Sequence, residues 1–206
     1  MNCKMWKTHY DKINKEKHPL ANTLSQALNL ISSRDGLKEF QAIDLGCGNG
    51  IDTFAMLEKG FSVLAIDKNP DASLLLKKRI NPEHLVRLSF QNLSFESLDE
   101  LPSADLVNAS FSLPFCHPDQ FEKFWSNIRG CINSEGFFCG HFFGTKDSWS
   151  SNSTMTFHNL EAVKRLFEGF ELLYFEETAK NGKTLSGKEK FWHVFHVVAK
   201  KLHSTK

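Results

Sequence analysis

The feature that most constrains the fold of this chain is a glycine-rich turn at residues 41–50, which read QAIDLGCGNG. An apolar run ends at Asp44, and three glycines then alternate with other residues before a helical pattern begins at Ile51. Two interpretations are open. One is an ordinary strand–turn–helix junction, in which glycine supplies positive φ and close packing. The other is a cofactor loop, in which missing Cβ atoms let a ligand lie against the backbone. Glycine at every second position exceeds the needs of one turn and favours the cofactor loop.

The spacing and charge of this loop select the kind of cofactor. A dinucleotide fingerprint, G-x-G-x-x-G, would place its third glycine where this chain has Ile51. Asp44 stands directly before the loop, where a carboxylate repels phosphate groups but suits a ligand with an ammonium group. S-adenosylmethionine carries an ammonium group and a sulfonium group, and it has no phosphate. The loop therefore favours S-adenosylmethionine over a dinucleotide.

The segment DLGCGNG at residues 44–50 closely resembles the first motif of class I S-adenosylmethionine-dependent methyltransferases. The C-terminal segment 192–196, WHVFH, is similar to the end of several small-molecule members that include the tellurite-resistance methyltransferase-like group. The resemblance implies S-adenosyl-L-methionine as cofactor and S-adenosyl-L-homocysteine as product. The loop residues that it implies for cofactor binding are Asp44, Gly46, Cys47, Gly48, Asn49 and Gly50.

The order of strand and helix patterns predicts an α/β fold. Apolar strand patterns alternate with helical patterns as far as about residue 143, which indicates right-handed βαβ units and a parallel sheet. Two final strands, at about 170–177 and 191–200, have a lysine- and glycine-rich connector between them and no strong helix. The resemblance implies a three-layer Rossmann-like methyltransferase fold, with a seven-stranded, mostly parallel sheet in the order 3-2-1-4-5-7-6 and an antiparallel last hairpin.

The chain of 206 residues is most simply one methyltransferase domain. Residues 1–18 form either a lid, with Tyr10 against the cofactor, or a tail; residues 19–38 form an N-terminal helix with its exit loop, and residues 39–200 form the core. A formal charge of +1 gives no global attraction to nucleic acid or to an anionic membrane. The sequence contains no membrane-spanning stretch, and its five cysteines lack disulfide spacing, so we expect a cytoplasmic protein. It leaves open whether the protein is a monomer or a homodimer.

The ends of the second and third strands supply further candidates for cofactor binding. Asp67 ends an apolar strand, where a carboxylate can accept both hydroxyls of a ribose; its plain alternative is a surface acid that caps the next helix. Asn92 follows the third strand, where the family commonly holds an acid or amide that bonds adenine. Lys68, Asn69 and Leu93 would flank the adenine.

The fourth and fifth strands end in aromatic residues. Ser110 and Phe111 follow the fourth strand, and the resemblance places them beside the cofactor sulfur. The Asn-Pro-Pro-Tyr motif of DNA amino methylases is absent at this point, as are the aspartate cluster of metal-dependent enzymes and the paired glutamates of arginine methylases. These absences favour a small and partly apolar acceptor. The acceptor pocket is predicted from Phe111, Phe115, Phe143 and Trp149.

No residue of the sequence stands out as an obligatory catalytic group. His141 and Asp147 are weak candidates for proton removal, since strand histidines are more often structural. His193 and His196, at a spacing of three on a strand, should point to opposite faces, so we expect no metal site from them.

The sequence thus predicts methyl transfer from S-adenosylmethionine to a small molecule by direct in-line displacement. Rival hypotheses are methylation of a protein or RNA that the connector lysines grip, and a cofactor-binding module without turnover. A dehydrogenase is the weakest rival, because Asp44 and Ile51 both oppose a pyrophosphate.

Overall fold

The structure, a computed structural model, describes residues 19–32, 39–184 and 186–203. Tyr10 and the rest of the N-terminal segment lie outside this part. The elements in chain order are α2 (Asn22–Ser32), β1 (Gln41–Leu45), α3 (Ile51–Glu58), β2 (Ser62–Ile66), α4 (Pro70–Arg79), η1 (Pro82–Arg87), β3 (Leu88–Gln91), η2 (Phe95–Ser97), β4 (Ala104–Ala109), η3 (Leu113–Phe115), α5 (Pro118–Cys131), β5 (Ile132–Phe143), α6 (Leu160–Leu166), β6 (Phe170–Lys183) and β7 (Glu189–Lys201).

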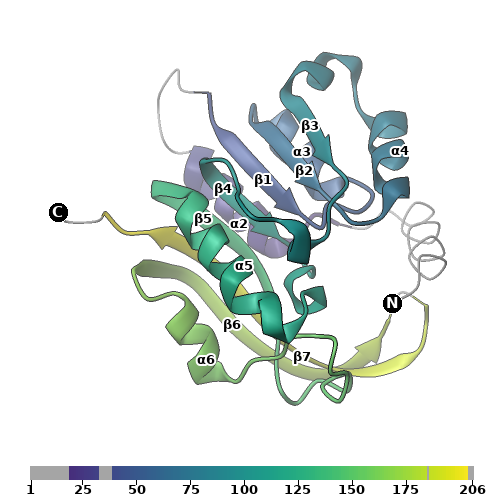
Figure 1. Cartoon of the computed structure of the whole chain (residues 1–206), viewed down its shortest axis with the longest axis vertical. Helices are drawn as coiled ribbons and strands as arrows, with labels where there is room; N and C mark the ends of the chain where they lie inside the picture. The colour runs from purple at the N-terminus through teal and green to yellow at the C-terminus, as the bar shows by residue number, and fades with distance from the viewer. Residues whose placement is uncertain (1–18, 33–38, 185, 204–206) are drawn as a thin grey trace.

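One sheet of seven strands organises the molecule, in the order β3-β2-β1-β4-β5-β7-β6 (Figure 1). Strands β1 to β5 pair in parallel, and β7 pairs antiparallel with both β5 and β6. The predicted α/β class, strand order and antiparallel last hairpin are therefore confirmed. The order reverses between β1 and β4, and ligands of such sheets bind beyond the carboxyl ends of the strands at that point.

Helices cover both faces of the sheet and make three layers. Apolar residues of α2 and α3 pack with β1 and β2 on one face, while α5 and α6 cover the other. Side-chain caps supplied by the sequence begin α4, α5 and α6. The Asn69 side chain accepts the Asp71 N–H ahead of α4, and the His117 ring accepts the Asp119 N–H ahead of α5. In both helices proline occupies the first turn, where its missing N–H costs nothing.

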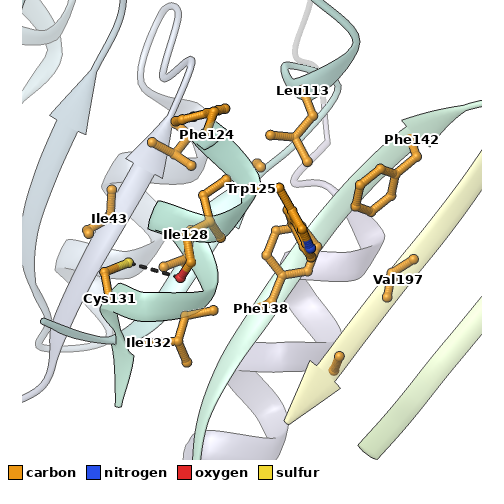
Figure 2. Packing of buried hydrophobic residues seen from close by; sticks show 14 of the residues in the cluster. Ile43, Leu113, Phe124, Trp125, Ile128, Cys131, Ile132, Phe138, Phe142 and Val197 are labelled. Carbon is orange, nitrogen blue, oxygen red and sulfur yellow. Dashed lines mark hydrogen bonds between the residues drawn. The ribbon is translucent and has the colours of Figure 1, made fainter. Parts of the chain in front are cut away.

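Seven of the 19 phenylalanines are buried in the core formed by α5 and the sheet face beneath it, part of which Figure 2 shows. Trp125 of α5 makes edge contacts with Phe138, Phe142 and Phe167, at ring-centroid distances of 5.2, 5.5 and 5.2 Å. Such aromatic pairs each contribute about 0.5–1.5 kcal/mol beyond the area they bury. This packing fixes β5 against α5 and gives the strand ends that carry the site a rigid support.

The last hairpin is longer than the sequence predicts. Pairing of β6 with β7 continues to Lys183 opposite Glu189, so the expected connector at about 178–190 is mostly strand. Lysine and glycine lower strand propensity, but the cross-strand ladder overrides this local preference. The paired arm extends past the body of the sheet toward the side where the site lies (Figure 1).

Candidate active site

A cavity of about 1290 Å³ lies beyond the carboxyl ends of β1 and β4. Its lining runs from the glycine loop, past the segment after β4, to the β6–β7 hairpin, and the start of the described chain at Pro19–Asn22 closes another side. Small-molecule pockets commonly enclose about 300–1,000 Å³. This cavity is therefore large enough to hold a nucleoside cofactor and an acceptor together.

The glycine loop enters the cavity with a backbone that only glycine adopts readily. Gly46, Gly48 and Gly50 have φ of 75°, 55° and 84°. A Cβ atom on Gly46 would lie 2.5 Å from Ser112 Cβ, so the bare backbone is also required for space. The amides of Gly46 and Cys47 both donate to the Ile66 carbonyl, at 2.8 and 3.0 Å, which ties the loop to β2. Gly50 itself does not line the cavity; it begins α3.

Asp44 is buried at the base of this loop and belongs to a group of acids. Its carboxylate accepts the Thr53 hydroxyl at 2.5 Å and the Asn108 amide at 2.8 Å. The same Asn108 nitrogen lies 3.1 Å from Asp52, which also lines the cavity. Burial, and next the charge of Asp52, raise the pKa of Asp44 to about 7. A cation in the cavity would relieve the repulsion between these two acids.

Asp67 lies at the end of β2 and connects to the glycine loop. Its Oδ2 accepts the Gly48 N–H at 2.9 Å, and its Oδ1 accepts the Asn69 N–H at 2.8 Å. Asn92 donates to the Asp67 main-chain carbonyl at 2.7 Å, so it holds this acid in place. Lys68 and Leu93 line the cavity, whereas Asn69 and Asn92 do not. The predicted ribose and adenine contacts stay predictions.

The half of the cavity beyond the glycine loop is walled by aromatic rings. Phe111, Phe115, Phe143 and Trp149, the four residues predicted for the acceptor pocket, all line it, and so does Trp192 of β7. Phe111 is 43% exposed, and its φ of 52° is rare for a side chain of this size. Strained backbone of this kind concentrates at functional sites. Ser110, which precedes it, also lines the cavity.

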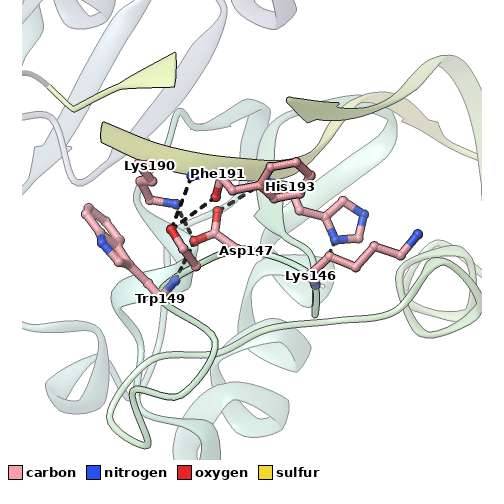
Figure 3. A network of polar contacts seen from close by, with 7 residues as sticks. Lys146, Asp147, Trp149, Lys190, Phe191 and His193 are labelled. Atoms are coloured by element: carbon pink, nitrogen blue, oxygen red, sulfur yellow. Dashed lines mark hydrogen bonds and ion pairs between the residues drawn. The ribbon is translucent and has the colours of Figure 1, made fainter. Parts of the chain in front are cut away.

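Asp147 lies behind this wall, and the cavity lining does not include it (Figure 3). Its carboxylate forms an ion pair with Lys190 of β7 and accepts the main-chain N–H groups of Trp149 and His193, at 2.9 and 3.2 Å. The Lys190 ammonium lies 4.0 and 4.3 Å from the ring centroids of Trp192 and Trp149. This arrangement joins the loop after β5 to the hairpin, and it leaves Asp147 without access to an acceptor.

His141 of β5 lines the cavity but is held as a neutral ring. Its Nδ1 accepts the Phe111 N–H at 3.3 Å, and the Phe111 ring stacks on it at 3.8 Å. Burial, with His196 nearby, lowers the pKa of His141 to about 3. His196 of β7 lines the cavity, while buried His193 pairs with Glu177 on the other face, as their spacing predicts.

The sequence argument missed the residues that strand pairing brings to the cavity. Those on the hairpin that line the cavity are Glu176, Thr178, Trp192 and His196. Asp52 of α3 also lines it and was missed, while Asn108 and Lys190 are buried behind the lining and hold Asp44 and Asp147. Asn108 left a usable signal, because it is a polar residue near the carboxyl end of the fully buried strand β4, after the apolar pair Leu106 and Val107. The hairpin residues left none, since their places depend on pairing across β6 and β7.

The cavity fits a cationic nucleoside. Ser112 lines it, and the Ser112 Oγ is a buried atom without a hydrogen-bond partner. Such orphaned groups are rare unless a ligand satisfies them. Acids surround the loop, and no basic side chain contacts it in the described residues except Arg79, at 3.5 Å from the Asn49 carbonyl. Within the same residues, no three His, Cys, Asp or Glu side chains are placed to hold a metal ion.

The strand order and the loop with acids at the ends of β1 and β2 define a class I S-adenosylmethionine-dependent methyltransferase fold. Residues 42–136 match the family model described as a methyltransferase domain. The resemblance inferred from the loop is thereby confirmed for residues 42–136, and the chain as a whole has the class I fold.

Comparison with known proteins gives relatives of several kinds. A cypemycin N-terminal methyltransferase from Streptomyces sp is 33% identical over 120 residues, which cover 55% of this chain and 47% of that protein. The chain thus spans about half the length of this curated relative. TehB from Haemophilus influenzae has a similar fold, with a TM-score of 0.72, 14% identity, and coverage of 92% of this chain and 65% of TehB.

A second solved structure extends over nearly the whole chain. The 1,6-didemethyltoxoflavin-N1-methyltransferase of Burkholderia thailandensis, with bound 1,6-didemethyltoxoflavin and S-adenosylhomocysteine, has a TM-score of 0.67 and 16% identity. The match covers 98% of this chain and 87% of that one. In the part of the chain that the structure describes, no helix is long and apolar enough to cross a membrane.

Proposed function

We propose that this protein is an S-adenosylmethionine-dependent methyltransferase that acts on a small-molecule acceptor by direct in-line displacement. One observation carries the proposal: a single cavity joins the acidic glycine loop to the aromatic wall. A donor bound at the loop and an acceptor bound at the wall would meet in this shared space. The cofactor supplies a methyl group on a sulfonium centre. The residues of this chain orient the donor and the acceptor and exclude water from the site.

The donor half of the site is assigned by charge. Asp44 and Asp52 attract the ammonium group, and Asp67 accepts the ribose hydroxyls at the end of β2. Cys47, Gly48 and Asn49 present their backbone, and Lys68 and Leu93 flank the base. Burial and the charge of Asp52 raise the pKa of Asp44, and a bound cation would offset both effects, so binding of the donor is favourable electrostatically.

The acceptor half is assigned by its apolar surface. The aromatic wall excludes water from the methyl group during its transfer and contacts the apolar face of the acceptor. It is formed by Phe111, Phe115, Phe143 and Trp149. One relative in fold supports this choice, since its structure holds 1,6-didemethyltoxoflavin together with S-adenosylhomocysteine. No residue is needed to activate an acceptor that already carries a lone pair and no proton.

A second candidate is an acceptor at the N-terminus of a peptide. The curated relative is named for such a substrate. The mouth of the cavity carries Lys180, Lys183 and Lys188, which could meet acidic groups of a larger partner. A rate of peptide methylation that falls steeply with salt would favour a peptide acceptor over a small molecule. That rate should also be lost when these lysines are changed to Gln.

Calorimetry with S-adenosylhomocysteine tests the proposal. The wild-type protein should bind it with measurable heat, and Asp44→Asn should lose most of the affinity. Asp99→Asn is the matched control, because Asp99 is an exposed acid paired with Lys123 outside the cavity. Absence of binding to the wild type would overturn the proposal. Release of S-adenosylhomocysteine from S-adenosylmethionine, screened with thiols, amines and oxyanions, then separates an enzyme from a binding module.

A further inference from the structure

Three residues on neighbouring strands stand in one row across the cavity face of the sheet. His141 of β5 pairs directly with His196 of β7, and His196 pairs directly with Glu176 of β6. All three line the cavity. The two imidazole rings are 4.9 Å apart between centroids and nearly perpendicular, at 85°. A carboxylate and two imidazoles therefore face the space that the acceptor is proposed to fill.

The two histidines have different freedom to take a proton. His141 is 1% exposed, its Nδ1 is engaged by the Phe111 N–H, and Phe111 covers its ring. Gaining a proton there would break that hydrogen bond and bury a charge. His196 is only partly buried, and it faces the cavity. Of this pair, His196 is the ring that can accept a proton.

The surroundings of His196 hold its ring in place and keep it neutral at rest. Its Nε2 lies 3.0 Å from the Thr178 hydroxyl of β6. The charged groups that face it are Glu176, which favours the protonated ring, and Lys180, which opposes it. Burial outweighs Glu176, so the pKa of His196 lies below its ordinary value and the ring is neutral at neutral pH. A ring that is neutral at rest and has a carboxylate beside it is suited to accept a proton and release it again.

We propose that His196 is a general base for acceptors that carry a proton, with Thr178 as its positioning residue and the charge of Glu176 favouring the protonated ring. This inference rests on the proposed methyltransferase function. The acceptor atom forms a bond to the methyl carbon while the carbon–sulfur bond breaks and its electron pair stays on sulfur. The proton of the acceptor passes to Nδ1 of His196, whose Nε2–H donates to Thr178, and then to solvent. The acceptor class is thus an N–H, O–H or S–H group on an apolar body.

The probe 4-nitrophenol tests this site without knowledge of the natural acceptor. It has an O–H group on an aromatic body, and only its ionised form absorbs visible light. At a pH where the free probe is mostly neutral, the wild-type protein should produce saturable phenolate absorbance, with or without S-adenosylhomocysteine. His196→Gln should reduce that absorbance at least about tenfold, and Glu176→Gln should reduce it partially.

Two controls make each outcome decisive. His203→Gln alters an exposed histidine remote from the cavity lining and should leave the absorbance unchanged. Calorimetry with S-adenosylhomocysteine on every variant shows that the donor half still folds and binds. Absence of phenolate absorbance with the wild type, or an equal signal from His196→Gln, overturns the assignment of His196. If the wild type fails to bind S-adenosylhomocysteine, the proposed function is overturned instead. The phenolate absorbance can be measured without that ligand, so it still tests His196 in that case.

Discussion

Asn108 on β4 donates a 2.8 Å hydrogen bond to Asp44 on β1. This bond links the side chains of the two neighbouring strands between which the strand order reverses. The same nitrogen reaches Asp52 at 3.1 Å, so a single amide holds two carboxylates beside the cavity. The charge of this group, rather than the glycines alone, sets how the site responds to pH and to ligand.

Cofactor binding should therefore depend on pH. The pKa of Asp44 is raised to about 7, and a bound ammonium group favours the ionised carboxylate. We expect the affinity for S-adenosylhomocysteine to rise as pH increases from about 6 to about 8, with release of a proton on binding. Calorimetry in buffers of different ionisation enthalpy measures the released proton. In Asp44→Asn the remaining affinity should lose this pH dependence, and an unchanged pH dependence would exclude Asp44 as its source.

The same carboxyl group should make the ligand-free protein less stable as pH rises. The pKa of Asp44 in the folded state, about 7, exceeds its ordinary value of 3.8, so the folded state holds this proton more tightly than the unfolded state. The contribution to stability is complete below about pH 4 and is lost as pH rises through about 7. Urea unfolding of the wild type and Asp44→Asn, compared between these pH values, should show a flatter profile for the variant. Parallel profiles would contradict the assignment.

The glycine loop and the acids at the ends of β1 and β2 could be predicted from the sequence, because their roles follow from residues that are close together in the chain. The same is true of the aromatic residues after β4 and β5, which reach the cavity because parallel strands end at one edge of the sheet. The row His141–His196–Glu176 could not be predicted. It depends on the register of three strands, and a shift of one residue would turn each side chain to the opposite face.

Asp147 illustrates the same limit from the other direction. Its position after β5 suggested a group near the acceptor, but an ion pair with Lys190, 43 residues further on, holds it behind the aromatic wall. The sequence also indicated a lysine- and glycine-rich connector, not a strand, where Lys190 lies. Only the paired hairpin brings this lysine under the rings of Trp149 and Trp192.

Removing one member of this buried pair should be costly. Lys190→Met leaves the Asp147 carboxylate buried without its cation, which we expect to lower the free energy of unfolding by about 3–5 kcal/mol. The double variant Lys190→Met/Asp147→Asn should be more stable than Lys190→Met alone, since no uncompensated charge remains. Denaturant unfolding of the single and double variants gives the coupling energy. Additive losses would show that the two side chains are not energetically coupled.

The final prediction separates the two reasons for glycine in the loop. Gly46→Ala combines positive φ with a Cβ atom 2.5 Å from Ser112 Cβ, next to the cavity. We expect a loss of stability of about 1–3 kcal/mol and a loss of S-adenosylhomocysteine binding of about tenfold or more, because Ser112 or the loop must move into the ligand space.

Gly60→Ala is the matched control for this change. Gly60 ends the α3 turn with φ of 91°, but a Cβ atom there meets nothing within 4 Å. It should carry the cost of the left-handed backbone, about 1 kcal/mol, without a change in binding. The difference between the two variants isolates the close approach at Gly46 from the backbone strain that they share. If both variants bind S-adenosylhomocysteine as the wild type does, Gly46 serves only the turn, and the ligand does not depend on the bare backbone at this position.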